Sequence, residues 1–219
     1  MDPPTWDEWT NVMHFMPHDK ACGPFNLHNE FYQHARTATK HLIWTLVKIC
    51  FTLGYISEEW KKVYIYPVPK PMDWESDITK TRLITLLDTL RKMIMKVITN
   101  RLFQIMVKHH ILKGNNFAGL PGGSTKTLIK LMNLIIEDVK TYRKPFWILL
   151  QDLSKAYNRV DLKILKKAID HIKIPAKCTS FILDFFTSRL NAIITTGDIL
   201  DFYDVKIGID QGEVISPLL

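Results

Sequence analysis

The chain has 219 residues, of which 47% are hydrophobic and 23% are charged. These fractions lie close to the globular average, so the sequence can build a packed core and disorder is not expected. No apolar run reaches the roughly 18 to 20 residues that a membrane-spanning helix needs. The first residues have neither the basic start nor the apolar stretch of a signal peptide, so we expect no membrane partner.

The three cysteines lie far apart, at Cys22, Cys50 and Cys178, and none belongs to a CxxC pair. This spacing argues against a disulfide framework and a zinc site, and it favours buried thiols in an intracellular setting, nuclear or cytoplasmic. The net charge of +7 and the pI of about 9.2 favour an anionic partner, of which polyphosphates are the commonest.

The N-terminal part of the chain is expected to combine a helix with one extended arm. Apolar residues at spacings of three and four predict a helix over 27–53, with Gly54 as its stop. Residues 61–66 alternate as a β-strand does. Three prolines follow within 67–71 and cannot donate ladder hydrogen bonds, so the strand is predicted to run out as an edge or an extended arm.

The middle of the chain is predicted to be helical, with two loops. Residues 72–81 and 113–123 are polar and rich in turn formers, which predicts the loops. A long amphipathic helix is predicted over 90–106, with Arg91 on its polar face. A further helix is marked by apolar residues over 128–139.

Strands return toward the C-terminus. The continuous apolar run 146–150 has the length of a strand and predicts one that is buried on both faces. A helix is marked over 162–172, and two strands are predicted over 192–196 and 203–209, joined around Gly197.

The last residues contain the start signals of a helix. Ser216 is a good N-cap and Pro217 suits the first helical position. Only Leu218 and Leu219 follow, so we expect the chain to be cut off inside a helix.

Two segments carry residue types suited to chemistry. Asp152 closes the apolar run 146–150 ahead of a helix, and the local pattern by itself favours a helix-capping role for such an aspartate. Gln211-Gly212 places an amide beside a flexible turn ahead of a predicted helix N-terminus, where backbone donors face outward. Here too the local pattern favours an ordinary joint between a strand and a helix.

Taken together with four upstream segments, these two resemble the reverse transcriptases of non-LTR (LINE-type) retrotransposons. The resemblance covers about residues 20–219, and six blocks in the expected order are far more specific than any one of them. The blocks are Lys20–Pro24, Trp60–Pro71, Thr81–Leu87 followed by Arg91-Lys92 and Arg101-Leu102, Asn116–Thr125, Asp152–Val160 and Gly208–Leu219.

The resemblance implies an α/β (α+β) polymerase right-hand fold. Residues 1–19 would be a lead-in, 20–145 the fingers region and 146–219 a partial palm, cut off before the third palm motif. It implies an RNA-directed DNA polymerase, a nucleotidyltransferase of a mobile element, with an RNA template, a DNA primer and deoxynucleoside triphosphates as partners.

The resemblance also assigns site residues. Asp152 would hold two Mg²⁺ ions, with help for one of them from the backbone carbonyl of Leu153. Tyr157 would lie under the incoming sugar and exclude a 2′-hydroxyl. The other nucleotide contacts would come from Gln211 and Gly212, and from Lys70 and Arg82 against the triphosphate.

The chain departs from the family pattern at three sites, and one motif is absent. Leu83 replaces the usual Pro, Asn158 the usual Asp, and Phe25-Asn26 the usual Asp-Gly. The third palm motif, an aromatic-x-Asp-Asp hairpin, would supply further carboxylates, yet no Asp-Asp pair occurs in the sequence. We therefore expect the fragment to be inactive alone. The alternatives are a non-catalytic nucleic-acid-binding remnant, or a polymerase half completed by a second chain or a downstream segment.

Overall fold

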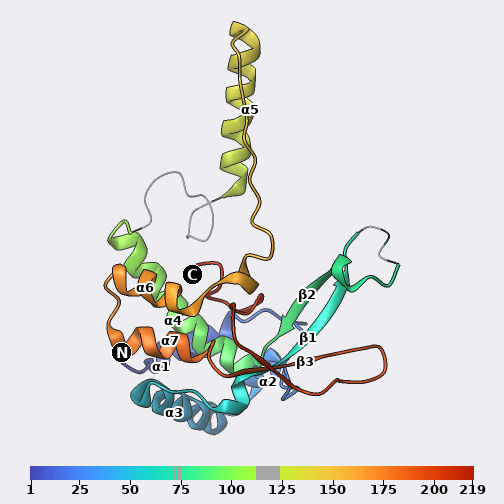
Figure 1. Cartoon of the computed structure of the whole chain (residues 1–219). Helices are drawn as coiled ribbons and strands as arrows, with labels where there is room; N and C mark the ends of the chain where they lie inside the picture. Colours follow the sequence, from blue (N-terminus) through green and yellow to red (C-terminus); the bar gives the residue numbers. More distant parts are fainter. Residues whose placement is uncertain (72, 74, 112–123) are drawn as a thin grey trace.

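The structure, a computed structural model, describes residues 1–71, 73, 75–111 and 124–219. The predicted loop 113–123, most of block Asn116–Thr125 and two residues of the predicted loop 72–81 therefore lie outside the described residues. The described part is a mixed α/β structure (Figure 1). Its helices are α1 (Trp6–His14), α2 (Asn29–His34), α3 (Thr37–Leu53), α4 (Thr89–Lys108), α5 (Thr125–Tyr142), α6 (Leu162–His171) and α7 (Ala176–Asp184), with 3₁₀ helices η1 (Glu58–Lys61), η2 (Ile78–Lys80) and η3 (Tyr157–Arg159).

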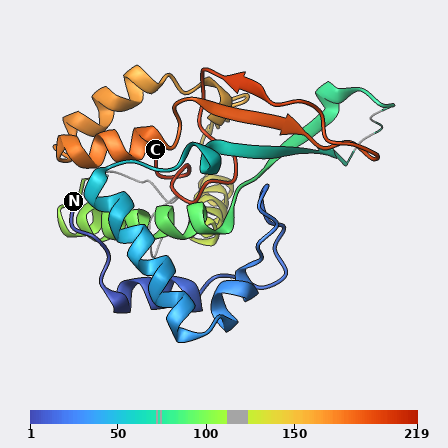
Figure 2. The same cartoon turned by 90° about the horizontal axis from the view of Figure 1, so that it is seen from below.

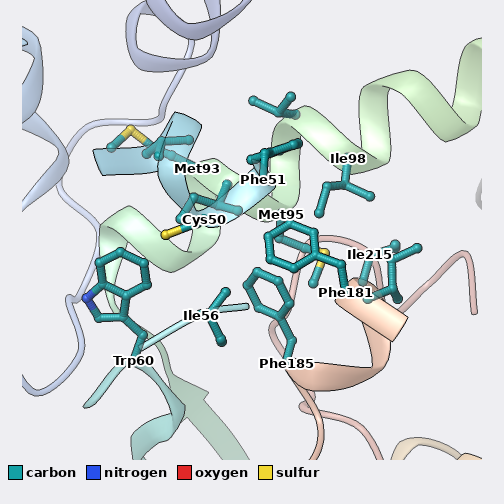
Figure 3. Packing of buried hydrophobic residues seen from close by; sticks show 14 of the residues in the cluster. Cys50, Phe51, Ile56, Trp60, Met93, Met95, Ile98, Phe181, Phe185 and Ile215 are labelled. Atoms are coloured by element: carbon teal, nitrogen blue, oxygen red, sulfur yellow. The ribbon is translucent and has the colours of Figure 1, made fainter. Parts of the chain in front are cut away.

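Helix α4 is the centre of the hydrophobic core. Apolar side chains on several sides of it are buried, and α3 and α7 belong to the same core cluster. Phe51 of α3 makes a T-shaped contact with Phe181 of α7, and Phe181 makes another with Phe185 directly after α7 (Figure 3). A helix that is apolar on most sides belongs in a protein interior. The prediction of a helix over 90–106 is confirmed, and it extends to Lys108.

The N-terminal segment is held to α4 by an ion pair, by hydrogen bonds from α4 side chains and by a close backbone approach. Arg101 donates to both carboxylate oxygens of Glu8 in α1, at 2.9 and 2.7 Å. Gly23 lies so close to the chain at Asp88 that a Cβ there would be 2.4 Å from the Asp88 nitrogen. Only a residue without a side chain fits at this point, which explains the Gly of the Lys20–Pro24 block.

The predicted helix 27–53 forms as two helices. The chain is extended at Ala35 and Arg36, between α2 and α3. Helix α3 ends at Gly54, the predicted stop, whose φ of 70° is the left-handed conformation common at helix C-termini. Its buried residues are Val47, Cys50 and Phe51.

The opposite, apolar face of α3 is exposed. Its residues are those whose spacing predicted the helix: Leu42, Leu46, Ile49 and Leu53. The spacing therefore predicted the helix correctly but not the face that packs.

One four-stranded sheet, ordered β2-β1-β3-β4, projects to one side of the helices (Figure 2). Its strands are β1 (Lys62–Pro69), β2 (Thr81–Leu86), β3 (Arg189–Ile193) and β4 (Tyr203–Val205). β1 pairs antiparallel with β2 and parallel with β3.

The prolines do not end β1. Pro67 faces Leu83 and Pro69 faces Thr81 in the β1–β2 ladder, whereas the pairing with β3 covers only residues 62–65. The prolines, which lack an N–H group, therefore do not prevent β1 from pairing with β2. The predicted free edge exists only where β1 runs past the end of its pairing with β3.

The strand predicted over 146–150 is absent, which corrects the expectation of a strand buried on both faces. Residues 144–153 form neither helix nor strand, and Trp147, Leu149 and Leu150 are 92%, 91% and 89% exposed. In Figure 1 the segment runs back alongside α5, which projects away from the other helices. A strand needs neighbours for its backbone groups, and none of the described strands pairs with this segment.

The remaining C-terminal elements agree with the sequence in kind and differ in extent. Helices α5 and α6 confirm the predicted helices, while β3 begins three residues before the predicted strand over 192–196 and β4 covers only part of 203–209. The Ser216 hydroxyl donates to the carbonyl of Asp210 at 2.8 Å, so it is no N-cap, although the N–H of Leu219 donates to Ile215 as in a helical turn. No described helix is long and apolar enough to span a bilayer.

Candidate functional site

A cavity of about 710 Å³ lies where the free end of the β1–β2 hairpin meets the segment that follows residue 150. Six of the seven predicted site residues line it: Lys70, Arg82, Asp152, Leu153, Tyr157 and Gln211. They come from three stretches of the chain that are more than 50 residues apart. The seventh, Gly212, follows Gln211 directly and packs against β2 instead.

The hairpin contributes the two cations. Lys70 directly follows β1, where its backbone N–H donates to the Lys80 carbonyl at 3.0 Å and its ammonium to the Thr79 carbonyl at 3.3 Å. Arg82 lies on β2 opposite Val68 and is exposed. Among the described residues, neither cation has a carboxylate within 4.0 Å, so both charges are available to an anion in the cavity.

The carboxylate of the cavity comes from Asp152. It lies exposed in an irregular segment, with the equally exposed Leu153 beside it. Asp152 is not a helix cap, because α6 is capped by Asp161, which accepts from the N–H groups of Lys163 and Ile164. The capping role that the local pattern favoured is therefore wrong.

The cavity residues match the ligand preference of Mg²⁺ only in part. Magnesium takes oxygen ligands and is commonly held by one or two carboxylates together with substrate phosphates. Asp152 supplies such an oxygen, but within the described ranges no three His, Cys, Asp or Glu side chains cluster closely enough to hold a metal by themselves. The donor set fits one ion shared with bound phosphates, and it does not fit a pair of ions.

Tyr157 is positioned by the backbone of the Gly208 block. The N–H of Ile209 donates to the Tyr157 carbonyl, and the N–H of Gly208 donates to the Val160 carbonyl, both at 2.9 Å. Gly208 has φ 84°, and a Cβ there would lie 2.9 Å from the Asn158 backbone. The glycine thus lets the two blocks come into contact, with the half-buried Tyr157 packed against the core.

Gln211 and Gly212 are held against β2. The N–H of Thr85 donates to the Gln211 carbonyl at 3.3 Å, and the Gln211 side chain lines the cavity. Gly212 has φ 129°, and a Cβ there would be 3.0 Å from the Thr85 carbonyl oxygen. Gly212 therefore supports the wall of the cavity and is not part of its lining.

Sequence reasoning missed four charged residues behind this wall. Arg91 was predicted on the polar face of its helix, but it is fully buried, together with Arg189, Asp210 and Glu213. Burial acts to lower the pKa of Arg91, yet the adjacent Glu213 and Asp210 carboxylates outweigh it and the pKa is raised. Burial raises the pKa of Glu213 against the opposing effect of Arg91. The spacing of Arg91 from Ile94 and Ile98, three and seven residues, places it on their face and could have indicated its burial.

Comparisons with known proteins agree with the motifs. Residues 68–219 match the family described as "Reverse transcriptase (RNA-dependent DNA polymerase)". A "Probable RNA-directed DNA polymerase from transposon BS" of Drosophila melanogaster is 27% identical over 168 residues, which are 75% of this chain. The chain spans 18% of that relative's length. The matched region includes the blocks Asp152–Val160 and Gly208–Leu219 and strand β2, and it confirms the family that the six blocks indicated: the chain belongs to the reverse transcriptase family.

Proposed function

We propose that the chain carries the nucleotide-binding part of an RNA-directed DNA polymerase from a mobile element. One observation carries the proposal: a single cavity is lined by two cations, a carboxylate, an aromatic ring and an amide, from Lys70, Arg82, Asp152, Tyr157 and Gln211. A deoxynucleoside triphosphate offers matching groups, namely a polyanion, a sugar and a base.

The two cations account for binding of the triphosphate. A guanidinium pairs with phosphate oxygens through two parallel hydrogen bonds, and an ammonium acts as a point charge. Lys70 directly follows β1 and Arg82 lies on the neighbouring strand β2, and both line the cavity, so both can approach one phosphate chain. Their charges also offset the negative charge that develops when the phosphodiester forms.

Asp152 would hold a Mg²⁺ together with the phosphates, and the backbone carbonyl of Leu153 would assist. The ion supplies charge neutralisation and orients the phosphoryl group. Asp152 is exposed in the cavity, so coordination needs no burial of an unpaired carboxylate.

Tyr157 would act as a steric gate for the sugar. Its backbone is fixed by the hydrogen bond from Ile209, and its ring is held on one side by the core. A ring in a fixed position leaves a defined space beside it, which suits discrimination between a 2′-hydrogen and a 2′-hydroxyl. Gln211, which lines the same cavity, would contact the same nucleotide.

Polymerisation requires more carboxylates than these residues supply. The 219 residues contain no Asp-Asp pair, and Asp152 is the carboxylate that lines the described cavity. Two metal ions clamp the attacking and leaving oxygens in this class of reaction. We infer that the chain binds nucleotide and primer–template without extending the primer.

A second candidate function is a polymerase half that is completed by further polypeptide. The exposed apolar segment 146–150 favours it, because Leu149 and Leu150 present apolar surface close to Asp152. Their backbone groups also have no hydrogen-bond partner among the described residues. A hairpin that paired with this segment would place its own carboxylates beside Asp152.

Primer extension tests both candidates. The purified chain is mixed with an RNA template, a DNA primer, deoxynucleoside triphosphates and Mg²⁺, with Asp152→Ala as the control. We expect no extension from the chain alone, but salt-dependent retention of primer–template. Extension that disappears in Asp152→Ala would show that these residues polymerise unaided. Retention of primer–template without any nucleotide binding would favour the non-catalytic remnant.

A further inference from the structure

Four buried charges form one connected cluster behind the cavity wall. Arg91 donates from Nε to Glu213 at 2.8 Å and from Nη2 to Asp210 at 2.6 Å. Arg189 donates to the other carboxylate oxygen of Asp210. Asp210 is therefore shared by two guanidinium groups, and the cluster contains two positive and two negative charges.

The same guanidinium groups also fasten the surrounding backbone. Arg91 donates to the carbonyls of Trp60 and Phe185, both at 3.2 Å, and Arg189 donates to those of Ile207 and Gly208 at 3.0 and 2.7 Å. Both ends of the turn that contains Gln211 are thus tied to α4 and β3, two elements that are distant in sequence.

Two residues of the cluster flank two of the five predicted nucleotide contacts in the sequence. Gln211 and Gly212 lie between Asp210 and Glu213, whose side chains point into the protein toward Arg91 while the Gln211 side chain lines the cavity. The Ser216 hydroxyl holds the Asp210 carbonyl as well, at 2.8 Å. By contrast, the backbone bond from Thr85 to Gln211 is long, at 3.3 Å.

Buried ion pairs often contribute little to stability compared with apolar side chains of the same volume, and in some proteins they serve to fix one specific geometry. An apolar side chain at position 210 or 213 would fill space without fixing where the intervening residues lie. The placement of this cluster, on either side of two cavity residues, suggests a role other than stability.

We propose that Arg91, Arg189, Asp210 and Glu213 are positioning residues that set Gln211 and Gly212 against β2, in the place that binds the nucleotide. The proposal rests on the proposed function only in naming the nucleotide as the ligand. The restraint on the turn 207–213 is a separate, measurable property.

The test uses the whole chain and two near-isosteric variants, Asp210→Asn and Glu213→Gln. The matched control is Asp184→Asn, which removes a carboxylate from another partly buried pair, with Lys61 at 2.7 Å, that does not touch the turn. Amide hydrogen exchange is followed in 207–213 and in β1, and binding of Mg²⁺–deoxynucleoside triphosphate is titrated in parallel.

We expect Asp210→Asn and Glu213→Gln to speed exchange by about tenfold at Gly208, Ile209 and Glu213, whose N–H groups donate hydrogen bonds within and around the turn. Exchange in β1 should be unchanged, and the nucleotide dissociation constant should rise by a similar factor. Unchanged exchange in the turn would overturn the proposal, as would an equal acceleration in Asp184→Asn. Should Asp210→Asn not fold, Glu213→Gln decides by the same criterion, since it leaves the ion pairs of Asp210 with Arg91 and Arg189 in place. If the wild-type chain binds no nucleotide, the proposed function is wrong. The amide hydrogen exchange rates in 207–213 still show whether the four charged residues hold the turn in place.

Discussion

The N–H of Ile209 donates to the carbonyl of Tyr157 at 2.9 Å, so a direct hydrogen bond joins the blocks Asp152–Val160 and Gly208–Leu219. The contact depends on Gly208, whose missing side chain leaves room for the Asn158 backbone. Tyr157 and Gln211 face the same cavity because of this joint, although 54 positions separate their places in the sequence.

Gly208→Ala should disrupt the joint. The residue has φ 84°, and the added Cβ would lie 2.9 Å from three backbone atoms of residues 157 and 158. We expect a loss of about 2–4 kcal/mol in the free energy of unfolding, measured by urea denaturation. Gly197→Ala is the matched control, because a Cβ at that position would meet no atom within 4 Å. A loss of equal size in the control would contradict the explanation.

Tyr157→Ala should relax discrimination against ribonucleotides. The variant opens the space beneath the sugar, so we expect the ratio of ribonucleotide to deoxyribonucleotide dissociation constants to fall by about tenfold. Tyr157→Phe keeps the ring and should keep the ratio. Tyr142→Ala, on the exposed face of α5, should leave it unchanged as well. An unchanged ratio in Tyr157→Ala would rule out the sugar gate.

The Glu8–Arg101 pair should make stability depend on pH in the acid range. The hydrogen bonds from Arg101 are the main cause that holds the pKa of Glu8 below its usual 4.5. A lowered folded-state pKa contributes stability that is present above pH 4.5 and is lost as the pH falls through the folded-state pKa.

The variant Glu8→Gln measures this contribution. At pH 7 it should cost about 0.5–1 kcal/mol, since solvent screens this partly exposed pair. The difference between wild type and variant should shrink as the pH drops below 4.5. Glu59→Gln, at the exposed pair with Lys62, serves as the control and should change stability by less than about 0.5 kcal/mol. A difference that grows toward low pH would contradict the assignment.

The exposed apolar segment should limit solubility. Leu149 and Leu150 are about nine-tenths exposed, and adjacent exposed apolar side chains promote association. We expect Leu149→Lys combined with Leu150→Glu to raise the fraction of monomer in size-exclusion chromatography without changing the melting temperature. A sharp monomeric peak from the unmodified chain would show that this surface causes no association.

The sequence predicted local elements well because their determinants are local. The spacing of Leu90, Ile94 and Leu102 reports which face of α4 is apolar, and a helix closes its hydrogen bonds within its own segment. Gly54 likewise marks the end of α3 because a left-handed stop depends on one residue.

Features that depend on distant partners could not be predicted from local patterns. The segment 146–150 has the composition of a buried strand, but a strand forms only where another strand meets its backbone groups. Arg91 can be buried because Asp210 and Glu213, more than 100 residues away, compensate its charge. Periodicity within α4 can place Arg91 on an apolar face, but it does not identify these two partners.

The candidate site could be predicted only in part, because its single motifs are ambiguous locally but their order along the chain is specific. Single motifs such as Asp152 resemble a helix cap locally, and only the order of six blocks pointed to a shared site. The cavity is lined by Lys70, Arg82, Asp152, Tyr157 and Gln211, while their roles toward a nucleotide stay predictions. Gly212 differs, because its role in the structure is close packing against Thr85.

Calorimetric titration of the chain with a Mg²⁺–deoxynucleoside triphosphate decides whether this cavity binds the nucleotide. Arg82→Ala and Asp152→Ala are compared with the surface controls Arg36→Ala and Asp170→Ala, which lie outside the cavity. We expect binding to weaken about tenfold or more in the first two variants and to be unchanged in the controls. Binding that is equally strong in all four variants, or absent from the wild-type chain, would contradict the assignment of this cavity as the nucleotide site.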